Sequence, residues 1–288
     1  MSSRRDFIKQ ASIAGSAFLL APSDLFRNHK GIGLQLYTLR DEVSKDLRST
    51  IARIAEIGFT DVETFGYGGG KYFGLSTRDF AAIFSQNKLK TPSGHYMLPD
   101  FLAKDDEDDL KRTVEDSHVM GHDFFTIPYL QEAQRKSLDD YKKLAEKMNK
   151  AGELVKAAGM NLAYHNHNFE FNDWGGGKTG YDILLNGTDP GLVSFEMDIF
   201  WVTKAGVDPV KLIGEHPGRF KMWHVKDMDT TPEKSFTEVG TGTINYKEIF
   251  KYQKASGMKH WFIEQDQIRG DHFASIAKSL SYLKNNIL

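Results

Sequence analysis

The segment LAYHNHNFEF, residues 162–171, places two histidines inside an otherwise apolar run. In an extended strand, residues two positions apart point to the same side, so His165 and His167 share one face of the segment. That face is either part of a functional site or a stretch where buried polar groups are satisfied by their neighbours. Both interpretations are open for this segment alone, because pairs of histidines also occur in protein cores.

Three further apolar segments carry metal-binding residue types near their ends. SFEMD ends in Asp198, MWHVKD contains His224, and WFIEQD contains Glu264. An unpaired charge is expensive to bury in an apolar strand. Together with His165, these side chains at four consecutive strand ends favour a metal site over a set of unrelated hydrogen bonds.

Such a site requires a fold that brings strand ends to one point. After residue 26, short β-favouring apolar runs alternate with longer helical patterns, and two of those patterns, 46–58 and 137–159, end in glycine. The eight predicted strands span roughly 31–37, 60–65, 90–95, 123–128, 160–166, 193–198, 219–226 and 260–265. Without an internal break in composition, this alternation predicts one α/β domain, a (β/α)₈ TIM barrel over residues 29–288. A doubly wound open sheet is the alternative, but its G-x-G-x-x-G motif after the first strand is missing.

The composition narrows the classes of partner and cofactor. The formal net charge of -2 gives no general electrostatic support for binding a nucleic-acid backbone, so we expect no nucleic-acid partner. The chain contains no cysteine, which excludes disulfides, thiolate nucleophiles and sulfur-ligated metals. His, Asp and Glu are therefore the strong metal ligands that remain.

Residues 1–28 have the order of an export signal. Arg4 and Arg5 are followed by a phenylalanine and a lysine, and then by a modestly apolar, small-residue stretch over 11–21. This order resembles a Tat-type signal, and the alternative is an amphipathic N-terminal helix. The apolar stretch is too short to span a bilayer comfortably. We therefore predict a periplasmic or otherwise exported protein with no stable membrane span in its mature form.

Taken together, five segments resemble the xylose-isomerase-like TIM-barrel family of sugar phosphate isomerases and epimerases. They are YHNHNFEF, SFEMDIFWVTKAG, FKMWHVKD, VGTGTINYKEIF and HWFIEQD. The resemblance implies one divalent metal ion held by side chains from the fifth to the eighth strand. Carried onto this sequence, the implied ligands are His165, Asp198, His224 and Glu264. It also implies that Lys226 of the HVKD motif reaches substrate oxygens, and a homodimer is plausible for the family.

The sequence departs from the family pattern at one of these ligands. Many family epimerases carry a glutamate on the fifth strand, where this chain has His165. A mixed nitrogen and oxygen ligand set suits Mn²⁺, Co²⁺ or Zn²⁺ better than Mg²⁺. The histidine also removes one of two opposed proton-transfer carboxylates, so Glu264 would act with His167 or Glu170 as the second base. Otherwise the reaction would be an elimination or hydration that needs one base and one acid.

The chemistry common to these options is metal-assisted removal of a proton next to a carbonyl, through an enediolate. Other strand-end residues fit a sugar pocket: Tyr37, Glu63, His95 and Lys226 could bind substrate, and Trp201 could stack on a sugar ring. The sequence thus predicts a metal-dependent sugar isomerase or epimerase with a small-molecule sugar substrate. The predicted export favours a free or oxidised glycoside as that substrate.

Three other functions stay open at this stage. The first is a lyase or hydratase on 3-keto-glycosides or other keto-sugars. The second is a non-catalytic extracytoplasmic sugar-binding protein, which would bind no metal. The third is an endonuclease IV-like enzyme, which would need more metal ligands and a basic DNA-binding face.

Overall fold

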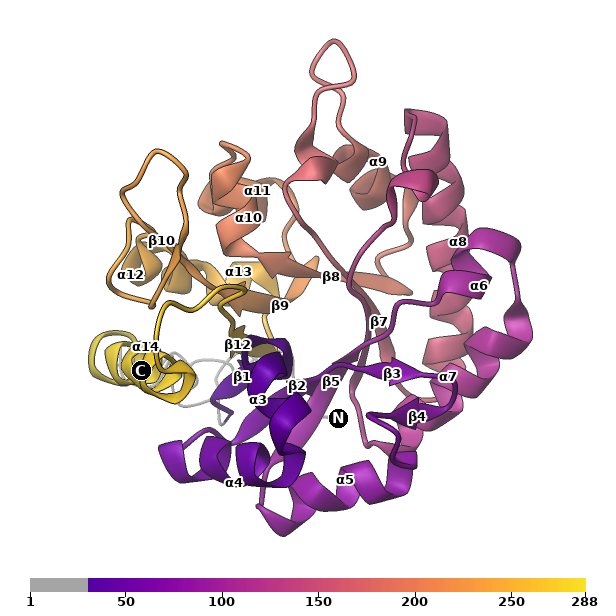
Figure 1. Cartoon of the computed structure of the whole chain (residues 1–288). Helices are drawn as coiled ribbons and strands as arrows, with labels where there is room; N and C mark the ends of the chain where they lie inside the picture. The colour runs from indigo at the N-terminus through magenta and orange to yellow at the C-terminus, as the bar shows by residue number, and fades with distance from the viewer. Residues whose placement is uncertain (1–30) are drawn as a thin grey trace, which may run out of the picture. The chain divides into compact units, whose positions relative to one another are not determined.

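The computed structural model describes residues 31–288, and within them eight parallel strands close into a barrel (Figure 1). The predicted export signal, residues 1–28, lies outside the described residues. The strands are β1 (Gly33–Gln35), β2 (Asp61–Thr64), β5 (Lys90–His95), β6 (Phe124–Ile127), β7 (Asn161–His165), β8 (Val193–Asp198), β9 (Phe220–Val225) and β12 (His260–Ile263). The order around the barrel is β1-β12-β9-β8-β7-β6-β5-β2, and β1 pairs with both β2 and β12. The TIM-barrel prediction is confirmed and the open-sheet alternative is wrong, because an open sheet would leave its edge strands unpaired.

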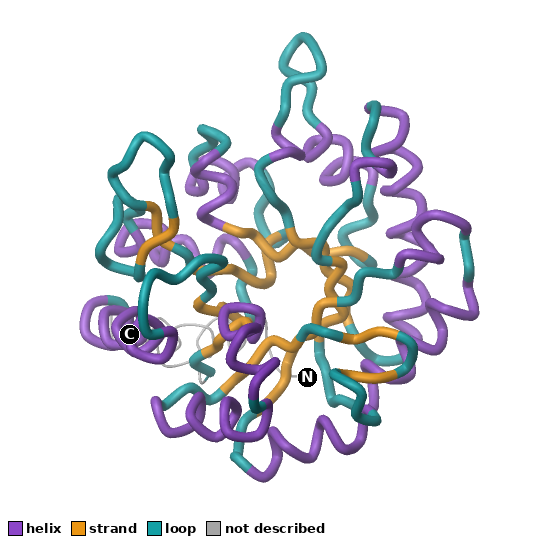
Figure 2. Tube along the Cα trace, in the orientation of Figure 1, coloured by secondary structure: helices purple, strands orange, loops and turns teal. Residues whose placement is uncertain are grey.

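Helices surround the strands (Figure 2). They are α3 (Arg40–Lys45), α4 (Leu47–Ile57), α5 (Thr77–Gln86), α6 (Pro99–Lys104), α7 (Glu107–Val119), α8 (Leu138–Ala157), α9 (Gly180–Gly187), α10 (Ile199–Lys204), α11 (Pro209–Glu215), α12 (Tyr246–Ile249), α13 (Gln253–Ser256) and α14 (His272–Asn286). The 3₁₀ turns are η1 (Leu36–Leu39), η2 (Glu132–Gln134), η3 (Phe169–Phe171) and η4 (Phe250–Tyr252). No helix among residues 31–288 combines the length and apolar character that a membrane crossing requires.

The two helices predicted from their terminal glycines begin and end at the expected residues. The side chain of Asp46 accepts a hydrogen bond from the Ser49 amide at 3.0 Å and caps α4. Gly58 follows α4 with φ 104°, a left-handed conformation that a residue with a Cβ rarely adopts. Ser137 caps α8 in the same way, and Gly159 has φ 83°.

Side chains along each strand point alternately into the barrel and toward the helices, and the inward-pointing side chains fill the interior in layers. A small apolar cluster plugs the interior, and it consists of Phe124, Ala163, Met222 and Phe262. Two residues further along the same four segments stand Thr126, His165, His224 and Glu264. These polar residues therefore face the same interior, one layer nearer the carboxyl ends of the strands, where barrel enzymes build their sites.

Two short hairpins decorate this carboxyl-end face. Strands β3 (Tyr67–Gly68) and β4 (Lys71–Tyr72) form the first, directly after β2. Strands β10 (Asp227–Met228) and β11 (Phe236–Thr237) form the second, directly after β9. Each hairpin contributes an aromatic side chain to the cavity at this face, Tyr67 from β3 and Phe236 from β11.

Candidate metal centre

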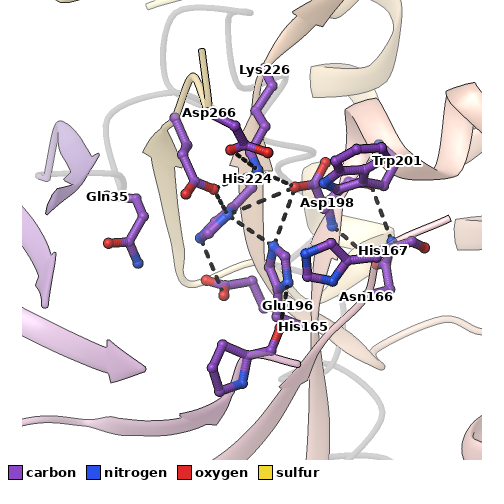
Figure 3. Close-up of polar contacts among 12 residues, drawn as sticks. Gln35, His165, Asn166, His167, Glu196, Asp198, Trp201, His224, Lys226 and Asp266 are labelled. Atoms are coloured by element: carbon purple, nitrogen blue, oxygen red, sulfur yellow. Dashed lines mark hydrogen bonds and ion pairs between the residues drawn. The ribbon is translucent and has the colours of Figure 1, made fainter. Parts of the chain in front are cut away.

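Four side chains from consecutive strand ends converge at one point of the barrel interior. His165, Asp198, His224 and Glu264 each offer a ligand atom, and these atoms all lie within 4.8 Å of one another. All four side chains are buried. The sequence predicted this set, and Figure 3 shows His165, Asp198 and His224 of the set lying side by side.

The strand register explains the convergence. Asp198 at the end of β8 pairs directly with His224 on β9, and His224 pairs with Phe262 on β12. Glu264 follows Phe262 by two positions, so it emerges from β12 on the same side. On the other flank, β7 pairs with β8 up to His165 and Glu196. Parallel pairing, with one register shift between β8 and β9, therefore brings the four side chains together at the carboxyl ends of the strands.

The outward contacts of the two histidines fix which ring nitrogens carry protons. His165 Nδ1 lies 3.2 Å from the carbonyl oxygen of Pro128, which can only accept, so Nδ1 is the donor. His224 Nε2 lies 2.6 Å from Glu63 Oε2 and likewise donates outward. In their neutral forms the rings then present bare nitrogens to each other, His165 Nε2 and His224 Nδ1, at 3.1 Å. Two facing lone pairs repel unless a proton or a cation lies between them.

This donor set fits a divalent metal ion. The inward atoms are two imidazole nitrogens and the carboxylate oxygens Asp198 Oδ2 and Glu264 Oε2, a mixture that suits Zn²⁺, Mn²⁺ or Co²⁺. Metal-bound histidines characteristically donate their other N–H to a carbonyl or carboxylate, as both rings do here. The buried groups could therefore hold a metal ion, with His165, Asp198, His224 and Glu264 as ligands.

Electrostatics keep the carboxylates of the cluster charged. Burial alone would raise the pKa of Asp198, but Lys226 at 2.8 Å and the adjacent histidines hold that pKa well below its ordinary value. Lys226 Nζ also lies 2.6 Å from Glu264 and holds the pKa of Glu264 low against the same burial. The three carboxylates around the ammonium, completed by Asp266 at 2.9 Å, raise the pKa of Lys226 despite its burial. Ionised carboxylates are the form in which oxygen ligands bind a cation.

A second polar layer lies deeper in the barrel, and it includes Glu63. Its carboxylate accepts hydrogen bonds from Gln35 Nε2 at 2.7 Å and from Ser93 Oγ at 2.6 Å, besides the one from His224. Glu63 is fully buried and does not line the cavity, so the predicted contact with substrate does not fit its position. The side chain instead supports His224 from beneath.

His95 joins this deeper layer to the cavity. Its Nε2 lies 3.0 Å from Glu196 and 3.2 Å from Glu63. Burial lowers the pKa of His95, but the two carboxylates outweigh that effect and raise the pKa to about 9. Glu63, His95, Glu196 and His224 also form a second group whose ligand atoms lie within 4.8 Å of one another.

Glu170, predicted as an alternative base, lies elsewhere. It belongs to η3, is fully buried and does not line the cavity. Its Oε1 accepts from the Tyr164 hydroxyl at 2.5 Å, and its Oε2 accepts from the His167 amide at 2.9 Å. Tyr164 alternates with the inward-facing His165, so its ring points into the helix layer. The role of proton-transfer group therefore does not fit Glu170, which instead anchors the backbone that carries His167.

A cavity of about 650 Å³ opens above the cluster. It is lined by six residues predicted to contact substrate or move protons, namely Tyr37, His95, His167, Trp201, Lys226 and Glu264. His165 and Glu264 reach its floor, whereas Asp198 and His224 lie behind them. Burial, His165 and Lys226 hold the pKa of His167 well below its ordinary value, so its ring is neutral.

Three residues of the site escaped the sequence analysis. Gln35 and Glu196 belong to the deeper layer, and Asp266 lines the cavity. Each stands two positions from a predicted site residue: Gln35 before Tyr37, Glu196 before Asp198, and Asp266 after Glu264. The period of two along β8 was therefore a signal that could have found Glu196, whereas Tyr37 lies in η1 and Asp266 lies beyond the end of β12, where strand alternation does not apply.

The aspartate of the HVKD motif holds a loop at the rim. Asp227 is buried, and its carboxylate accepts hydrogen bonds from the amides of Gly240, Gly242 and Ile244 at 2.8, 3.0 and 3.1 Å. The Tyr246 hydroxyl, at the end of this loop, donates to the Lys226 carbonyl at 2.5 Å. The glycine-rich loop is thus tied to the strand end that carries Lys226.

Comparisons with known proteins agree with this fold. A family model described as a xylose isomerase-like TIM barrel matches residues 51–286. Inosose dehydratase from Clostridium beijerinckii is 27% identical over 168 residues, which are 51% of this chain and 54% of that enzyme, so the chain spans about half the length of the curated relatives it matches.

Two solved structures extend the comparison. A sugar phosphate isomerase/epimerase from Parabacteroides distasonis has a TM-score of 0.76 and 29% identity, covering 88% of this chain and 97% of that one. The IOLI protein, solved with a bound zinc atom, is 14% identical with a TM-score of 0.66 and covers 89% of this chain and 96% of that one. At that identity the second likeness shows the shared fold alone.

Proposed function

The chain belongs to the xylose isomerase-like TIM barrel family, and from that premise we propose that it is a metal-dependent isomerase or epimerase of a small sugar or sugar derivative. The reaction we propose begins with removal of a proton from a carbon next to a carbonyl group. One observation carries the proposal above the others. Two imidazole nitrogens and two carboxylates that are held ionised converge at the floor of a 650 Å³ cavity.

The four converging side chains would hold the metal ion. When bound there, a divalent ion would polarise a substrate carbonyl and stabilise the negative charge that develops on its oxygen. We assign Glu264 to the metal ahead of proton transfer, because its Oε2 is already engaged by His224 at 2.6 Å and by Lys226 at 2.6 Å. Lys226 lines the cavity and, as a held ammonium, would donate to a second substrate oxygen.

Two cavity residues are suited to move the proton. His167 is neutral, and its Nδ1 has no hydrogen-bond partner among the described residues. Burial raises the pKa of Asp266 above its ordinary value, which makes its carboxylate a stronger base. They follow β7 and β12, which β8 and β9 separate around the barrel. Proton return by the same group to the other carbon of the enediolate gives isomerisation. Proton return by the opposite group to the original carbon, from the other face, gives epimerisation.

A dehydratase or lyase acting on keto-sugars is the second candidate. The position that would complete an opposed carboxylate pair is His165, and the curated relatives are named inosose dehydratases. In this version the first proton removal is the same. A protonated group then assists departure of a hydroxyl or alkoxyl group from the neighbouring carbon. The two candidates therefore share the metal and the base and differ in the fate of the neighbouring substituent.

The proposal also includes the cellular location. The twin arginine and short apolar stretch of residues 1–28 support export, and an exported enzyme would meet free or oxidised glycosides rather than phosphorylated intermediates. Fractionation of a tagged full-length chain, with and without Arg4→Lys and Arg5→Lys, tests this part. Retention of both forms in the cytoplasmic fraction would contradict it.

The central experiment measures metal content and proton exchange together. Wild-type protein and the His224→Ala variant are analysed for bound Mn, Co and Zn, and then incubated in D₂O with a panel of keto-sugars, keto-glycosides and inososes. We expect near-stoichiometric metal and deuterium incorporation next to the carbonyl for wild type, and neither for the variant. Epimer or isomer formation supports the first candidate, and an unsaturated product supports the second. Sugar binding without bound metal would overturn both and indicate a sugar-binding protein.

A further inference from the structure

The cavity above the metal centre has a polar floor and aromatic walls. His95, His165, Lys226, Glu264 and Asp266 form the floor. The rings above it come from separate segments and form two contacting groups, Tyr37 with Phe65, and Tyr129, His167, Trp201 and Phe236. Aromatic rings offer flat apolar faces of the kind that pack against the C–H face of a sugar ring. The polar groups suited to catalysis thus lie in only one part of the cavity, and the rest of the cavity is bordered by aromatic rings.

The volume exceeds what one sugar ring needs. A hexose consists of six CHOH units, so at about 30 Å³ for each unit, the share of one water molecule, it occupies roughly 180 Å³. The cavity measures about 650 Å³. Even with a metal ion and several waters on the floor, space for a second ring remains between the walls.

The wall on the Trp201 side is held in place by contacts between aromatic rings. The Trp201 and Phe236 rings meet edge to face, with centroids 5.6 Å apart at 81°. Phe236 stacks at 4.2 Å on Phe200, which is fully buried, and His167 lies 5.6 Å from Trp201. Phe236 belongs to β11, and Trp201 to the first turn of α10 directly after Asp198, so two separate elements hold this wall. Such a wall is positioned in advance of binding.

The cationic side chains that line the cavity already form ion pairs or hydrogen bonds within the protein. Besides its histidines, the cavity is lined by two cations from the described part of the chain, Arg40 and Lys226. Lys226 is enclosed by Asp198, Glu264 and Asp266. Arg40 donates to the carbonyls of Tyr37 and Asp266, at 3.2 and 2.8 Å, and covers the Tyr37 ring. Lys226 can donate a hydrogen bond to a neutral sugar oxygen, but the three carboxylates around it offset its charge and would repel a phosphate dianion, so the lining disfavours a phosphorylated sugar.

We propose that the space beside Trp201 and Phe236 is a subsite for the second ring of an uncharged, unphosphorylated two-ring glycoside. This inference rests on the proposed function, because the first ring would be the one whose carbonyl reaches the metal centre. The second ring would pack its apolar face on the aromatic wall and leave its hydroxyls toward solvent. The substrate class is then narrower than a free monosaccharide and different from a sugar phosphate.

Equilibrium binding tests the subsite without requiring turnover. Isothermal titration calorimetry on the full-length, metal-loaded protein compares methyl glucoside, the disaccharides trehalose and cellobiose, and glucose 6-phosphate. We expect at least one disaccharide to bind about tenfold more tightly than methyl glucoside. We expect glucose 6-phosphate to bind no more tightly than methyl glucoside. Equal affinities for one and two rings, or tighter binding of the phosphate, would overturn the proposal.

Variants locate the effect on the wall. Loss of one aromatic contact, worth roughly 0.5–1.5 kcal/mol, predicts a three- to tenfold weaker disaccharide for Phe236→Ala, with methyl glucoside affinity unchanged. Phe236→Leu keeps an apolar side chain and guards against misfolding, and it should give a smaller loss of the same kind. Trp174→Ala is the matched control, because Trp174 is exposed and does not line the cavity. Equal losses for both ligands would place the effect in general folding and reject the subsite.

The two proposals fail in different ways. If disaccharides bind preferentially but no proton exchange occurs with any carbonyl substrate, the subsite stands and the proposed reaction falls. If monosaccharides exchange protons and two-ring compounds show no preference, the reaction stands and the subsite falls.

Discussion

The two sides of β7 bury acidic groups in opposite ways. On the inner side, His165 points toward Asp198 and Glu264, whose pKa values are held low by Lys226 and the histidines despite burial. On the outer side, Glu170 is surrounded by tyrosines, and burial raises its pKa to about 7. The residue types are similar and both sites are fully enclosed, yet one set of carboxylates is charged and the other carboxyl retains its proton up to neutral pH.

The difference lies in the neighbours rather than in the depth of burial. A buried carboxylate stays ionised where cations or several hydrogen-bond donors offset its lost hydration. The inner side supplies the Lys226 ammonium and imidazoles, which a metal ion can replace in part. The outer side supplies one tyrosine hydroxyl and one backbone amide. The inner arrangement is therefore suited to binding a cation, and the outer one to holding a loop in place.

The largest expected effect is a loss of bound metal from a variant on the inner side of β7 but not from a variant on the outer side. His224→Ala removes one of four converging ligands, so we expect loss of bound metal and a fall in proton exchange of roughly 10²–10³-fold or more. Glu170→Gln changes a carboxyl of equal burial on the outer side and should keep its metal. Elemental analysis of both purified variants measures this contrast. Equal metal content in the two variants would contradict the assignment.

A smaller effect concerns the layer beneath the metal centre. Glu63 accepts the outward N–H of His224, so Glu63→Gln keeps the shape but removes the charge that orients and polarises this ring. Outer partners of this kind change metal affinity by roughly 10–100-fold. Competition with a chelator of known affinity measures the change. Glu63 would be a purely structural residue if the metal affinity stayed at the wild-type value while the thermal stability fell.

The sequence predicted the eight strands and the four inner side chains for one reason. Apolar runs of strand length ended in polar residues, and parallel strands that close into a barrel bring those ends together. The prediction failed for Glu170 because the chain leaves the strand at His165 and enters η3, where alternation by two no longer decides which way a side chain points. The sequence also predicted that Glu63 contacts substrate in the cavity. How deep a strand-end residue lies in a barrel depends on how neighbouring strands are staggered. That stagger arises from pairing with β1 and β5, which no local segment specifies.

On the outer side, the pKa of Glu170 predicts a pH-dependent stability. Its pKa is about 7 in the folded protein and near 4.5 in an unfolded chain, so folding is favoured by its bound proton. This stabilisation is fully present below pH 4.5 and is lost as the pH rises through 7. Glu170→Gln removes one hydrogen-bond acceptor and should cost about 1–3 kcal/mol at pH 5. The difference from wild type should shrink at pH 8, where wild type bears the cost of a buried charge. Urea unfolding at the two pH values measures it, and a constant difference would contradict the raised pKa.

The smallest expected effect has the opposite dependence on pH. Tyr164→Phe removes the hydroxyl that donates to Glu170 Oε1, a bond that lowers the pKa of this carboxyl against its burial. The loss should cost about 0.5–1.5 kcal/mol, and more at pH 8 than at pH 5, because the ionised carboxylate depends on the donor more than the neutral acid does. When unfolding curves are recorded side by side, the stability difference from wild type should therefore widen for Tyr164→Phe and narrow for Glu170→Gln as the pH rises. Parallel behaviour of the two variants would mean that Glu170 keeps one protonation state throughout, and the contrast between the two sides of β7 would then lie in geometry alone.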